Sequence, residues 1–347
     1  IKPSATIMVT MKAMELKAQG YDIVSLGAGE PDFDTPLHVR EAAIAAINEG
    51  KTRYTAVDGT PELKAAIIEK FRRDNSLEFG PEQIIASNGA KQCLYNLMVA
   101  TLNHGDEVVV PAPYWVSYPD MVKLADGLPV ILSTTAESDF KITAKQLQAS
   151  LTDNTRMIIM NSPSNPTGKV YTDQEYREIG EVLCEHPKVL IACDDIYEFI
   201  YWGEGPYRTF LNTCPELAHR TLVINGVSKG YAMTGWRIGF LAGPEGLVKA
   251  MRKVQSQSTS CPGSVSQAAS VAALTGPQGC VEEMRQAFQD RYVYMHGALY
   301  GLPGVGWGSC DGAFYALPSF QGFIENREAL RDDVVLAAGL LEDAGVA

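Results

Sequence analysis

The chain has 347 residues, of which 46% are hydrophobic, so it is long enough for two domains, or one large domain with an appendage, around a substantial core. Its formal net charge of -12 argues against nucleic acid and anionic membrane surfaces as partners, since both favour a basic face. Seven cysteines without a C-x-x-C pair indicate neither a disulfide framework nor a zinc ribbon, and favour a reducing compartment.

The location of the protein is only partly constrained by its sequence. No run of about 18 or more uncharged apolar residues occurs, so no transmembrane helix is predicted. The first residue is Ile1 rather than methionine, which leaves a removed leader open. We therefore expect a cytoplasmic protein, with an organelle stroma or matrix as the alternative.

Short apolar runs alternate with helical patterns through the middle of the chain. This alternation is typical of an α/β domain with a largely parallel sheet that is covered on both faces. The predicted strands are residues 84–87, 107–110, 129–132, 156–160, 189–193, 222–225 and 238–242.

Helix starts are predicted between these runs. Thr35 with Pro36, and Thr60 with Pro61, each combine an N-cap with a proline in the first turn, and Thr172 with Glu175 forms a capping box. From Gly276 the pattern predicts a long helix to about Tyr300, then a turn at 301–308 and a strand at 313–317. The change of pattern indicates a second, smaller domain.

Lys229 follows a β-branched apolar run, with Ser228 before it and Arg237 eight positions after it. Most lysines are solvated side chains in surface loops, and that is the alternative here. A lysine at a strand end can instead form a Schiff base, provided that burial or a nearby cation such as Arg237 lowers its pKa. The hydroxyl and the guanidinium suit a phosphate. Together these side chains favour pyridoxal phosphate as the ligand.

Two further strand ends carry polar side chains. Segment 161–168, Asn-Ser-Pro-Ser-Asn-Pro-Thr-Gly, has the composition of an ordinary turn, but at a strand end it can present the amide of Asn165 to a ligand. Segment 193–198 puts Asp194 three residues before Tyr197. Asp194 is either an N-cap of a following helix or the partner of a protonated pyridine nitrogen, in which case Tyr197 can bind the ring's phenolic oxygen.

Two more segments follow strands. In residues 87–92 a helix begins with small residues, and its first N–H groups, near Ala90 and Lys91, suit a phosphate, although plain helix capping uses the same residue types. In residues 113–119, Trp115 is placed to stack on a flat ring, although tryptophan is more often a core residue.

Competing signatures are incomplete. Gly27 and Gly29 lack the third glycine of a dinucleotide-binding motif, and Gly50-Lys51-Thr52 has Ala45 where a P-loop has its first glycine. The five histidines show no metal-binding spacing, so no metal site is predicted.

Taken together, the five segments resemble the fold type I pyridoxal-phosphate enzymes, specifically the class I aminotransferases of the aspartate aminotransferase group. The resemblance extends over nearly the whole chain, from residues 2–6 (Lys-Pro-Ser-Ala-Thr) and 26–33 to 311–315 (Asp-Gly-Ala-Phe-Tyr). It implies a large domain with a mostly parallel seven-stranded sheet and a smaller α+β domain. We expect the large domain at residues 38–288 and the small one at residues 1–37 and 289–347.

The resemblance also implies a role for each residue around the ring of pyridoxal 5'-phosphate. Lys229 looks like the Schiff-base lysine that also moves the substrate's proton. Asp194 is similar to the partner of the pyridine nitrogen, and Tyr197 and Asn165 to the residues that bind the phenolic oxygen. Trp115 looks like the aromatic side chain that stacks on the ring.

The phosphate is expected to lie in a cup formed by the Ala90 and Lys91 region, Ser228 and Arg237. In the family the cup is completed by a tyrosine from a second subunit, which matches Tyr54. The resemblance therefore implies a homodimer with shared active sites.

Substrate contacts follow from the same resemblance. Gly29, Trp115 and Asn165 match positions around the amino acid's α-carboxylate. Lys91 matches a lysine that pairs with the distal carboxylate of aspartate or glutamate, whereas a solvated lysine there would be disfavoured by the helix dipole. The mobile N-terminal segment that assists the substrate would contribute Lys2, Ser4 and Thr6.

The implied function is transfer of an amino group between aspartate or glutamate and a 2-oxo acid in two half-reactions, with prephenate as a further substrate in the same subgroup. The family's arginine for the α-carboxylate belongs to a segment beyond Ala347, so we expect the small domain to be incomplete in this chain. The alternatives are another enzyme on the same fold, such as a carbon–sulfur lyase or a cyclopropane-forming synthase, and a non-catalytic cofactor-binding module.

Overall fold

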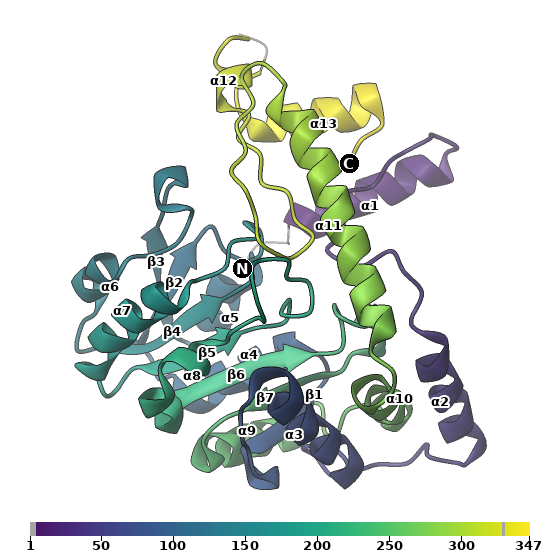
Figure 1. Ribbon diagram of the computed structural model, residues 1–347, viewed down its shortest axis with the longest axis vertical. Coiled ribbons are helices and arrows are strands. Elements are labelled where there is room, and N and C mark those ends of the chain that lie inside the picture. Colours follow the sequence, from purple (N-terminus) through teal and green to yellow (C-terminus); the bar gives the residue numbers. More distant parts are fainter. Residues whose placement is uncertain (1–4, 328–329) are drawn as a thin grey trace. The chain divides into compact units, whose positions relative to one another are not determined.

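The computed structural model describes residues 5–327 and 330–347, which form two compact units (Figure 1). The larger unit comprises residues 31–289 and 310–314, and the smaller one the described residues up to 30, 290–309 and those from 315 onward. The domain boundaries at 38 and 288 remain a prediction, although the larger unit ends close to them. Among the described residues, no helix is both long enough and apolar enough to cross a bilayer.

The larger unit is built on a seven-stranded sheet with the order β1-β7-β6-β5-β4-β2-β3. Its strands are β1 (Ile84–Ser87), β2 (Glu107–Ala112), β3 (Leu128–Ser133), β4 (Thr155–Asn161), β5 (Leu190–Asp194), β6 (Thr221–Gly226) and β7 (Gly239–Ala242). Neighbouring strands are parallel except that β7 is antiparallel to both β1 and β6. The predicted α/β fold with a mostly parallel sheet is therefore confirmed, and each predicted strand is present.

Helices cover both faces of this sheet because its strands are apolar on both faces. One core joins the sheet to α4 (Ala90–Thr101), α5 (Ser117–Leu124) and α9 (Glu245–Gln257). On the other face, two cores join it to a longer series of elements. These are α2 (Leu37–Asn48), α3 (Pro61–Asn75), α6 (Ala144–Ser150), α7 (Asp173–Cys184), α8 (Phe210–Thr213) and α10 (Ser264–Thr275).

Short 3-10 turns complete the larger unit: η1 (Pro81–Gln83), η2 (Ala136–Ser138), η3 (Pro215–Arg220) and η4 (Thr234–Trp236). The long helix α11 (Gly279–Tyr300) begins in the larger unit and ends in the smaller one. It starts three residues later than predicted, because α10 extends to Thr275 and Pro277 follows it.

Two of the three predicted helix caps are confirmed. The Thr60 hydroxyl accepts from the Leu63 N–H, and Thr172 forms a capping box with Glu175. The prediction for Thr35 is wrong, because its hydroxyl donates to the Ala232 carbonyl (2.7 Å) and accepts from the Trp236 indole (2.9 Å). This threonine therefore ties down the loop after β6 rather than capping α2.

The predicted strand at 313–317 is also wrong. Gly312 makes a single bridge to Tyr201, and Ala313 has a φ of 59°, a left-handed conformation that interrupts a strand. Residues 310–314 instead pack within the larger unit: the Ala313 N–H donates to the Ile200 carbonyl (2.7 Å), and a Cβ on Gly312 would lie 2.6 Å from the same carbonyl oxygen.

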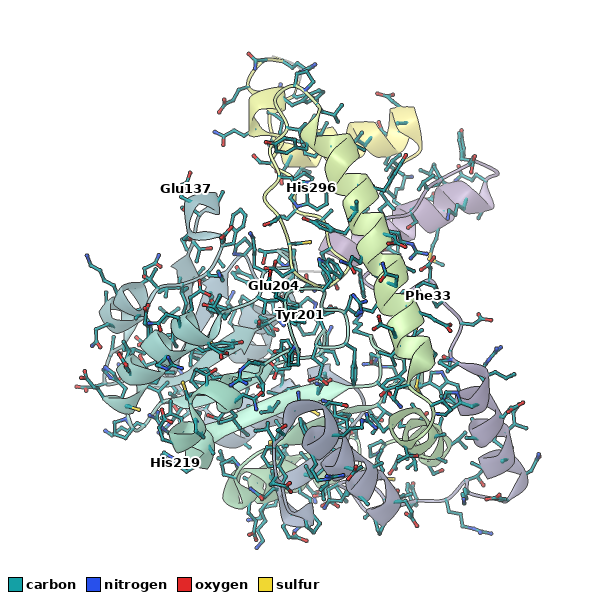
Figure 2. All side chains as sticks on the ribbon, viewed as in Figure 1. Phe33, Glu137, Tyr201, Glu204, His219 and His296 are labelled. Carbon is teal, nitrogen blue, oxygen red and sulfur yellow. The ribbon has the colours of Figure 1, made fainter. Side chains whose placement is uncertain are left out.

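The smaller unit contains α1 (Ala5–Ala18), the end of α11, α12 (Gln321–Ile324) and α13 (Asp333–Ala344). Ala13, Ile23 and Leu341 form its small apolar cluster. On α11, His296 stacks on Tyr300 at 5.6 Å between ring centroids and also contacts Trp307 (Figure 2). Among its described residues, the smaller unit has only isolated β-bridges as strand-like pairings, such as that of Val24 with Val346.

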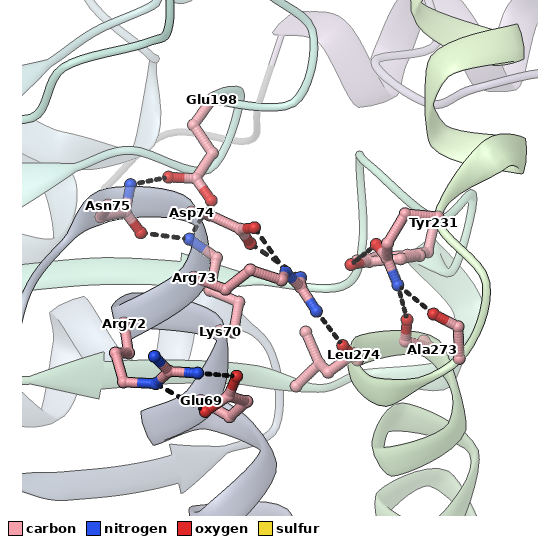
Figure 3. A network of polar contacts seen from close by, with 12 residues as sticks. Glu69, Lys70, Arg72, Arg73, Asp74, Asn75, Glu198, Tyr231, Ala273 and Leu274 are labelled. Atoms are coloured by element: carbon pink, nitrogen blue, oxygen red, sulfur yellow. Dashed lines mark hydrogen bonds and ion pairs between the residues drawn. The ribbon is translucent and has the colours of Figure 1, made fainter.

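A buried ion pair ties α3 to the segment after β5 (Figure 3). The Lys70 ammonium contacts Glu198, and both side chains are almost fully buried, at 0% and 3% exposure. Asn75 joins them: its carbonyl oxygen accepts from Lys70 (2.6 Å), and its amide donates to Glu198 (2.8 Å). Because Glu198 follows Tyr197 directly, this cluster fixes the segment that carries Tyr197.

We expect Lys70→Met to lower the free energy of unfolding by about 3–5 kcal/mol, because it leaves the Glu198 carboxylate buried without its cation. The double variant Lys70→Met/Glu198→Gln should recover much of that loss, since no unpaired charge remains. Urea denaturation measures the free energy of unfolding of the single and the double variant. Arg72→Ala, which breaks an exposed pair with Glu69, is the control and should cost less than about 1 kcal/mol. A loss below about 1 kcal/mol for Lys70→Met would contradict the expectation.

Candidate active site

Three neighbouring parallel strands bring polar side chains to one edge of the sheet. Asn161 is the last residue of β4 and lies opposite Asp194, the last residue of β5. Asp194 in turn lies opposite Ile224 on β6, and Lys229 follows three residues after β6 ends. Because the carboxyl ends of parallel strands meet at one edge, residues far apart in the sequence lie together there (Figure 1).

Asp194 is a buried carboxylate, 4% exposed. Burial raises its pKa to about 6, while the hydrogen bond from Tyr118 and the charge of Lys229 oppose the rise. No helix follows it directly, because residues 196–199 form a turn and residue 200 a bend. The N-cap alternative for Asp194 is therefore excluded, and its carboxylate is close enough to Lys229 for the lysine's charge to act on it.

Two aromatic rings flank the half-buried Lys229. Its ammonium lies 5.8 Å from the centre of the Tyr197 ring and 5.5 Å from that of Phe314. The two rings meet edge to face, with centroids 5.7 Å apart, and Phe314 also packs on Phe288 at 5.1 Å. The amine thus lies against apolar surface, as a nucleophilic lysine requires.

Asn165 and Tyr197 are brought together as predicted, with the Asn165 amide 3.5 Å from the Tyr197 hydroxyl. Asn161 sets their position. Its side-chain oxygen accepts from the Asn165 N–H (2.7 Å), and its amide donates to the Asp194 carbonyl (2.8 Å). A hollow of about 380 Å³, including its open mouth, has Tyr118, Asn161 and Asn165 in its lining.

Arg237 lies against the start of α4. Its guanidinium donates to the Thr234 carbonyl (2.8 Å) and the Asn88 carbonyl (3.3 Å), and a Cβ added to Gly89 would come within 2.2 Å of it. Arg237 itself has a φ of 57°, a left-handed conformation that a non-glycine residue adopts at a cost. Glycine at 89 is therefore needed to bring a cation to the positive end of a helix.

The first N–H groups of α4 remain available next to this cation. Within the described part of the chain, the amides of Ala90 and Lys91 have no hydrogen-bond acceptor, as expected for the first positions of a helix. Two N–H groups, a helix N-terminus and a guanidinium form an anion cradle. The buried Ser228 lies near the start of the loop between β6 and β7 that carries Arg237 near its end.

Lys91 and Trp115 are also neighbours. The Lys91 ammonium lies 4.7 Å from the centre of the Trp115 ring. Desolvation lowers the pKa of Lys91, and the nearby charge of Arg237 adds to this effect. Trp115 is partly buried and meets Tyr118 edge to face at 5.4 Å, so it is not simply a core residue.

The structure describes only some of the remaining predicted residues. Tyr54 is 91% exposed on its own chain. Gly29 belongs to the smaller unit, where a Cβ would lie 3.0 Å from the Tyr315 hydroxyl. Lys2 and Ser4 lie outside the described residues, and Thr6 is described only as part of the α1 backbone.

Four residues of the site were not predicted: Gly89, Tyr118, Asn161 and Phe314. Tyr118 and Asn161 lie inside the quoted segments, but nothing in the sequence indicates that they contact Asp194 or Asn165. Phe314 belongs to a segment predicted as a strand of another domain. Gly89 offered a signal, since a glycine before a helix start is compatible with close approach of a neighbour.

The residues present fit pyridoxal phosphate. The cradle at Gly89 has the donors and charge that a phosphate needs, and a side chain at position 89 would fill it. Lys229 can reach a carbonyl carbon from its apolar surroundings, and Asp194 is a buried acid aimed into the site. A strand-end site of this kind is typical of α/β proteins that bind a phosphorylated ligand.

The chain is similar to proteins of known activity over its whole length. The family model for aminotransferase class I and II matches residues 21–347. An aspartate/prephenate aminotransferase of Nitrosomonas europaea is 52% identical over 95% of this chain and 82% of its own. An aspartate aminotransferase of Geobacillus stearothermophilus is 48% identical over 100% and 88%.

Solved structures agree with these relatives. The aspartate aminotransferase of Rhizobium meliloti superimposes with a TM-score of 0.94 at 45% identity, covering 100% of this chain and 90% of the other. The aspartate aminotransferase of Thermus thermophilus, solved with maleate, superimposes with a TM-score of 0.91 at 42% identity, covering 100% of this chain and 88% of the other. The chain therefore belongs to the class I and II aminotransferases. The family resemblance predicted from the five segments is confirmed, and the protein is an aminotransferase.

Proposed function

We propose that the protein is a pyridoxal-phosphate-dependent aminotransferase that transfers the amino group of aspartate or glutamate to a 2-oxo acid. Two observations carry this proposal: the charge of Lys229 acts on the buried Asp194, and an anion cradle lies at Gly89 in the same unit. The bound cofactor supplies a carbonyl for amino groups and a conjugated ring that accepts the electrons of the substrate's Cα–H bond.

Each residue is then assigned a role. From its apolar position beside Tyr197 and Phe314, Lys229 would bind the cofactor's carbonyl carbon and would move the substrate's α-proton. Asp194 provides a negative charge opposite the ring nitrogen, which strengthens the ring as an electron acceptor. Asn165 and Tyr197 bind the ring's phenolic oxygen.

The phosphate is held by the amides of Ala90 and Lys91, the Ser228 hydroxyl and the Arg237 guanidinium. We infer that Tyr54 of a second copy completes this cup. Tyr54 is 91% exposed, and Leu37, Ile44 and Ile47 on α2 are also exposed, at 61%, 58% and 54%. Exposed apolar residues on one segment are typical of an interface. They support a homodimer with shared active sites.

Aspartate or glutamate is proposed as the amino donor because of Lys91 and the relatives' names. Lys91 is desolvated at a helix N-terminus, so a second anion beside it would be stabilised. The relatives are named aspartate and aspartate/prephenate aminotransferases, and maleate, in the Thermus structure, is a dicarboxylate. Prephenate is a further substrate that the first of these names supports. Gly29, Trp115 and Asn165 would surround the α-carboxylate, and Lys2, Ser4 and Thr6 would assist.

A cytoplasmic location is proposed with this function. All seven cysteines are free thiols, which is typical of proteins in a reducing compartment. An organelle stroma or matrix is reducing as well and remains the alternative.

Lys91→Ala tests the substrate. We expect kcat/KM for aspartate to fall roughly 10- to 100-fold, because a hydrogen bond between two charged groups is lost, while that for alanine changes less than about threefold. The backbone N–H at position 91 is retained, so the phosphate cradle stays intact. Lys123→Ala, which removes an exposed lysine from the end of α5, is the control. Equal losses for both amino acids would reject a distal-carboxylate role for Lys91.

The two alternative functions differ in their products. With aspartate alone and no acceptor, the aminotransferase converts one equivalent of cofactor per site into pyridoxamine phosphate. A carbon–sulfur lyase instead cleaves a sulfur-containing amino acid into a thiol, ammonia and a 2-oxo acid, and a non-catalytic binding module does neither. Single-turnover product analysis with aspartate, followed by the same analysis with a sulfur-containing amino acid, distinguishes the three.

A further inference from the structure

Tyr118 forms a short hydrogen bond with Asp194. It lies on α5, is 2% exposed, and its hydroxyl donates to one Asp194 oxygen at 2.6 Å. The other oxygen accepts from the Ile196 N–H at 3.4 Å. A distance of 2.6 Å is in the range of hydrogen bonds from a hydroxyl to an ionised acceptor. The strongest donor to this carboxylate in its own chain is therefore a buried phenol.

The sheet geometry explains why these two side chains meet. Side chains alternate along β5, so Asp194 lies on the same face as Ala192, which shares a core with Tyr118. Cys193 lies on the opposite face, in the core that contains Tyr176. The Tyr118 ring is held by Trp115, which it meets edge to face at 89°.

We propose that Tyr118 is a positioning residue that keeps Asp194 ionised and in one orientation, so that the carboxylate presents a full negative charge to the cofactor's ring nitrogen. The cofactor part of this inference rests on the proposed function. The contact between Tyr118 and Asp194 does not.

The electrostatic surroundings of Asp194 support this role. Burial is the largest influence on its pKa and acts against ionisation. Of the groups that favour ionisation, the Tyr118 hydrogen bond contributes most, followed by the Ile196 N–H and the charge of Lys229. Among the described residues, the other titratable neighbours are Cys93, a buried thiol on α4 whose pKa is raised to about 12, and the adjacent Cys193 and Asp195. None of these neighbours supplies a positive charge.

Tyr118→Phe removes the hydroxyl and keeps the ring, and Tyr176→Phe is the matched control, since Tyr176 is equally buried in the core on the other face of β5. At pH 7 we expect Tyr118→Phe to weaken pyridoxal phosphate binding to the full-length chain roughly tenfold, as lost hydrogen bonds to charged groups do. In the holoenzyme we expect kcat to fall by about the same factor. The KM for aspartate should change less than about twofold, because the contact lies on the cofactor side rather than the substrate side.

A third measurement needs no cofactor. Burial raises the pKa of Asp194 in the folded protein to about 6, so the acid is protonated in the unmodified protein and in Tyr118→Phe at low pH, and ionised in both at high pH. Without the Tyr118 hydroxyl the folded pKa rises further, because the ionised form loses its donor. The stability deficit of Tyr118→Phe should therefore grow as the pH rises through about 6 and then level off. The deficit of Tyr176→Phe should not vary in this way.

The outcomes separate the inference from the proposed function. If the unmodified chain does not bind pyridoxal phosphate, the proposed function is wrong, while the pH dependence still decides whether Tyr118 controls Asp194. If Tyr118→Phe matches Tyr176→Phe in cofactor affinity, in kcat and in a pH-independent deficit, Tyr118 is a packing residue and the inference is overturned.

Discussion

Lys229→Ala is expected to reduce kcat by roughly 10⁴-fold or more, because one side chain is both the nucleophile for the cofactor and the group that moves the α-proton. The structure places its amine beside Tyr197 and Phe314 and near Asp194, and none of these neighbours can supply a second amine. Steady-state turnover with aspartate and 2-oxoglutarate measures the loss, and the visible absorbance of the reconstituted enzyme should disappear with it.

Lys229→Arg is the control that separates charge from chemistry. Arginine keeps a positive charge near Asp194 but stays protonated and does not act as a nucleophile. We expect this variant to be as inactive as Lys229→Ala while binding the cofactor's phosphate through the unchanged cradle. Retention of more than about a tenth of the activity by either variant would show that Lys229 is not the reacting lysine.

Asp194→Asn is expected to lower kcat by roughly 10²–10³-fold, the cost of removing one preorganised electrostatic group from a site. An amide of nearly the same shape can still accept the hydrogen bond from Tyr118, so the loss reports the missing charge rather than missing packing. Kinetics with saturating cofactor separate the effect on kcat from weaker cofactor binding.

The neighbouring Asp195 provides the matched control. It is also a buried carboxylate, 1% exposed, but it interacts with Thr209 and Tyr207, whereas Asp194 interacts with Tyr118 and Lys229. Asp195→Asn should change kcat less than about threefold, although it alters the stability. Similar losses for both variants would mean that buried charge at this strand end matters for folding and not for the reaction.

Much of the fold was predictable because its signals are local. Seven short apolar runs predicted the seven strands, and Thr60 and Thr172 predicted helix starts with side chains that bond within three residues. Thr35 has the same local pattern, but its hydroxyl is used by Ala232 and Trp236, about 200 residues away in the sequence. A residue does not cap its helix when its hydroxyl binds distant partners instead, and no local sequence pattern reveals such partners.

The gathering of certain side chains at one edge of the sheet was also predictable. Lys229, Asp194 and Asn165 each follow an apolar run, and parallel strands must bring such positions to one edge. Tyr118 and Phe314 were missed because their roles depend on which ring or carboxylate they meet across the fold. The contact between Arg237 and Gly89 was missed for the same reason, because it joins two segments that are far apart in the chain.

The antiparallel pairing of β6 and β7 closes the loop between them. Gly226 at the end of β6 pairs with Gly239 at the start of β7, so the chain leaves the sheet and returns to it at the same place. Lys229 and Arg237 both lie on this closed excursion. The proposed reacting amine and the proposed phosphate-binding cation therefore lie on one short segment of the larger unit, so the distance between them is set within that unit.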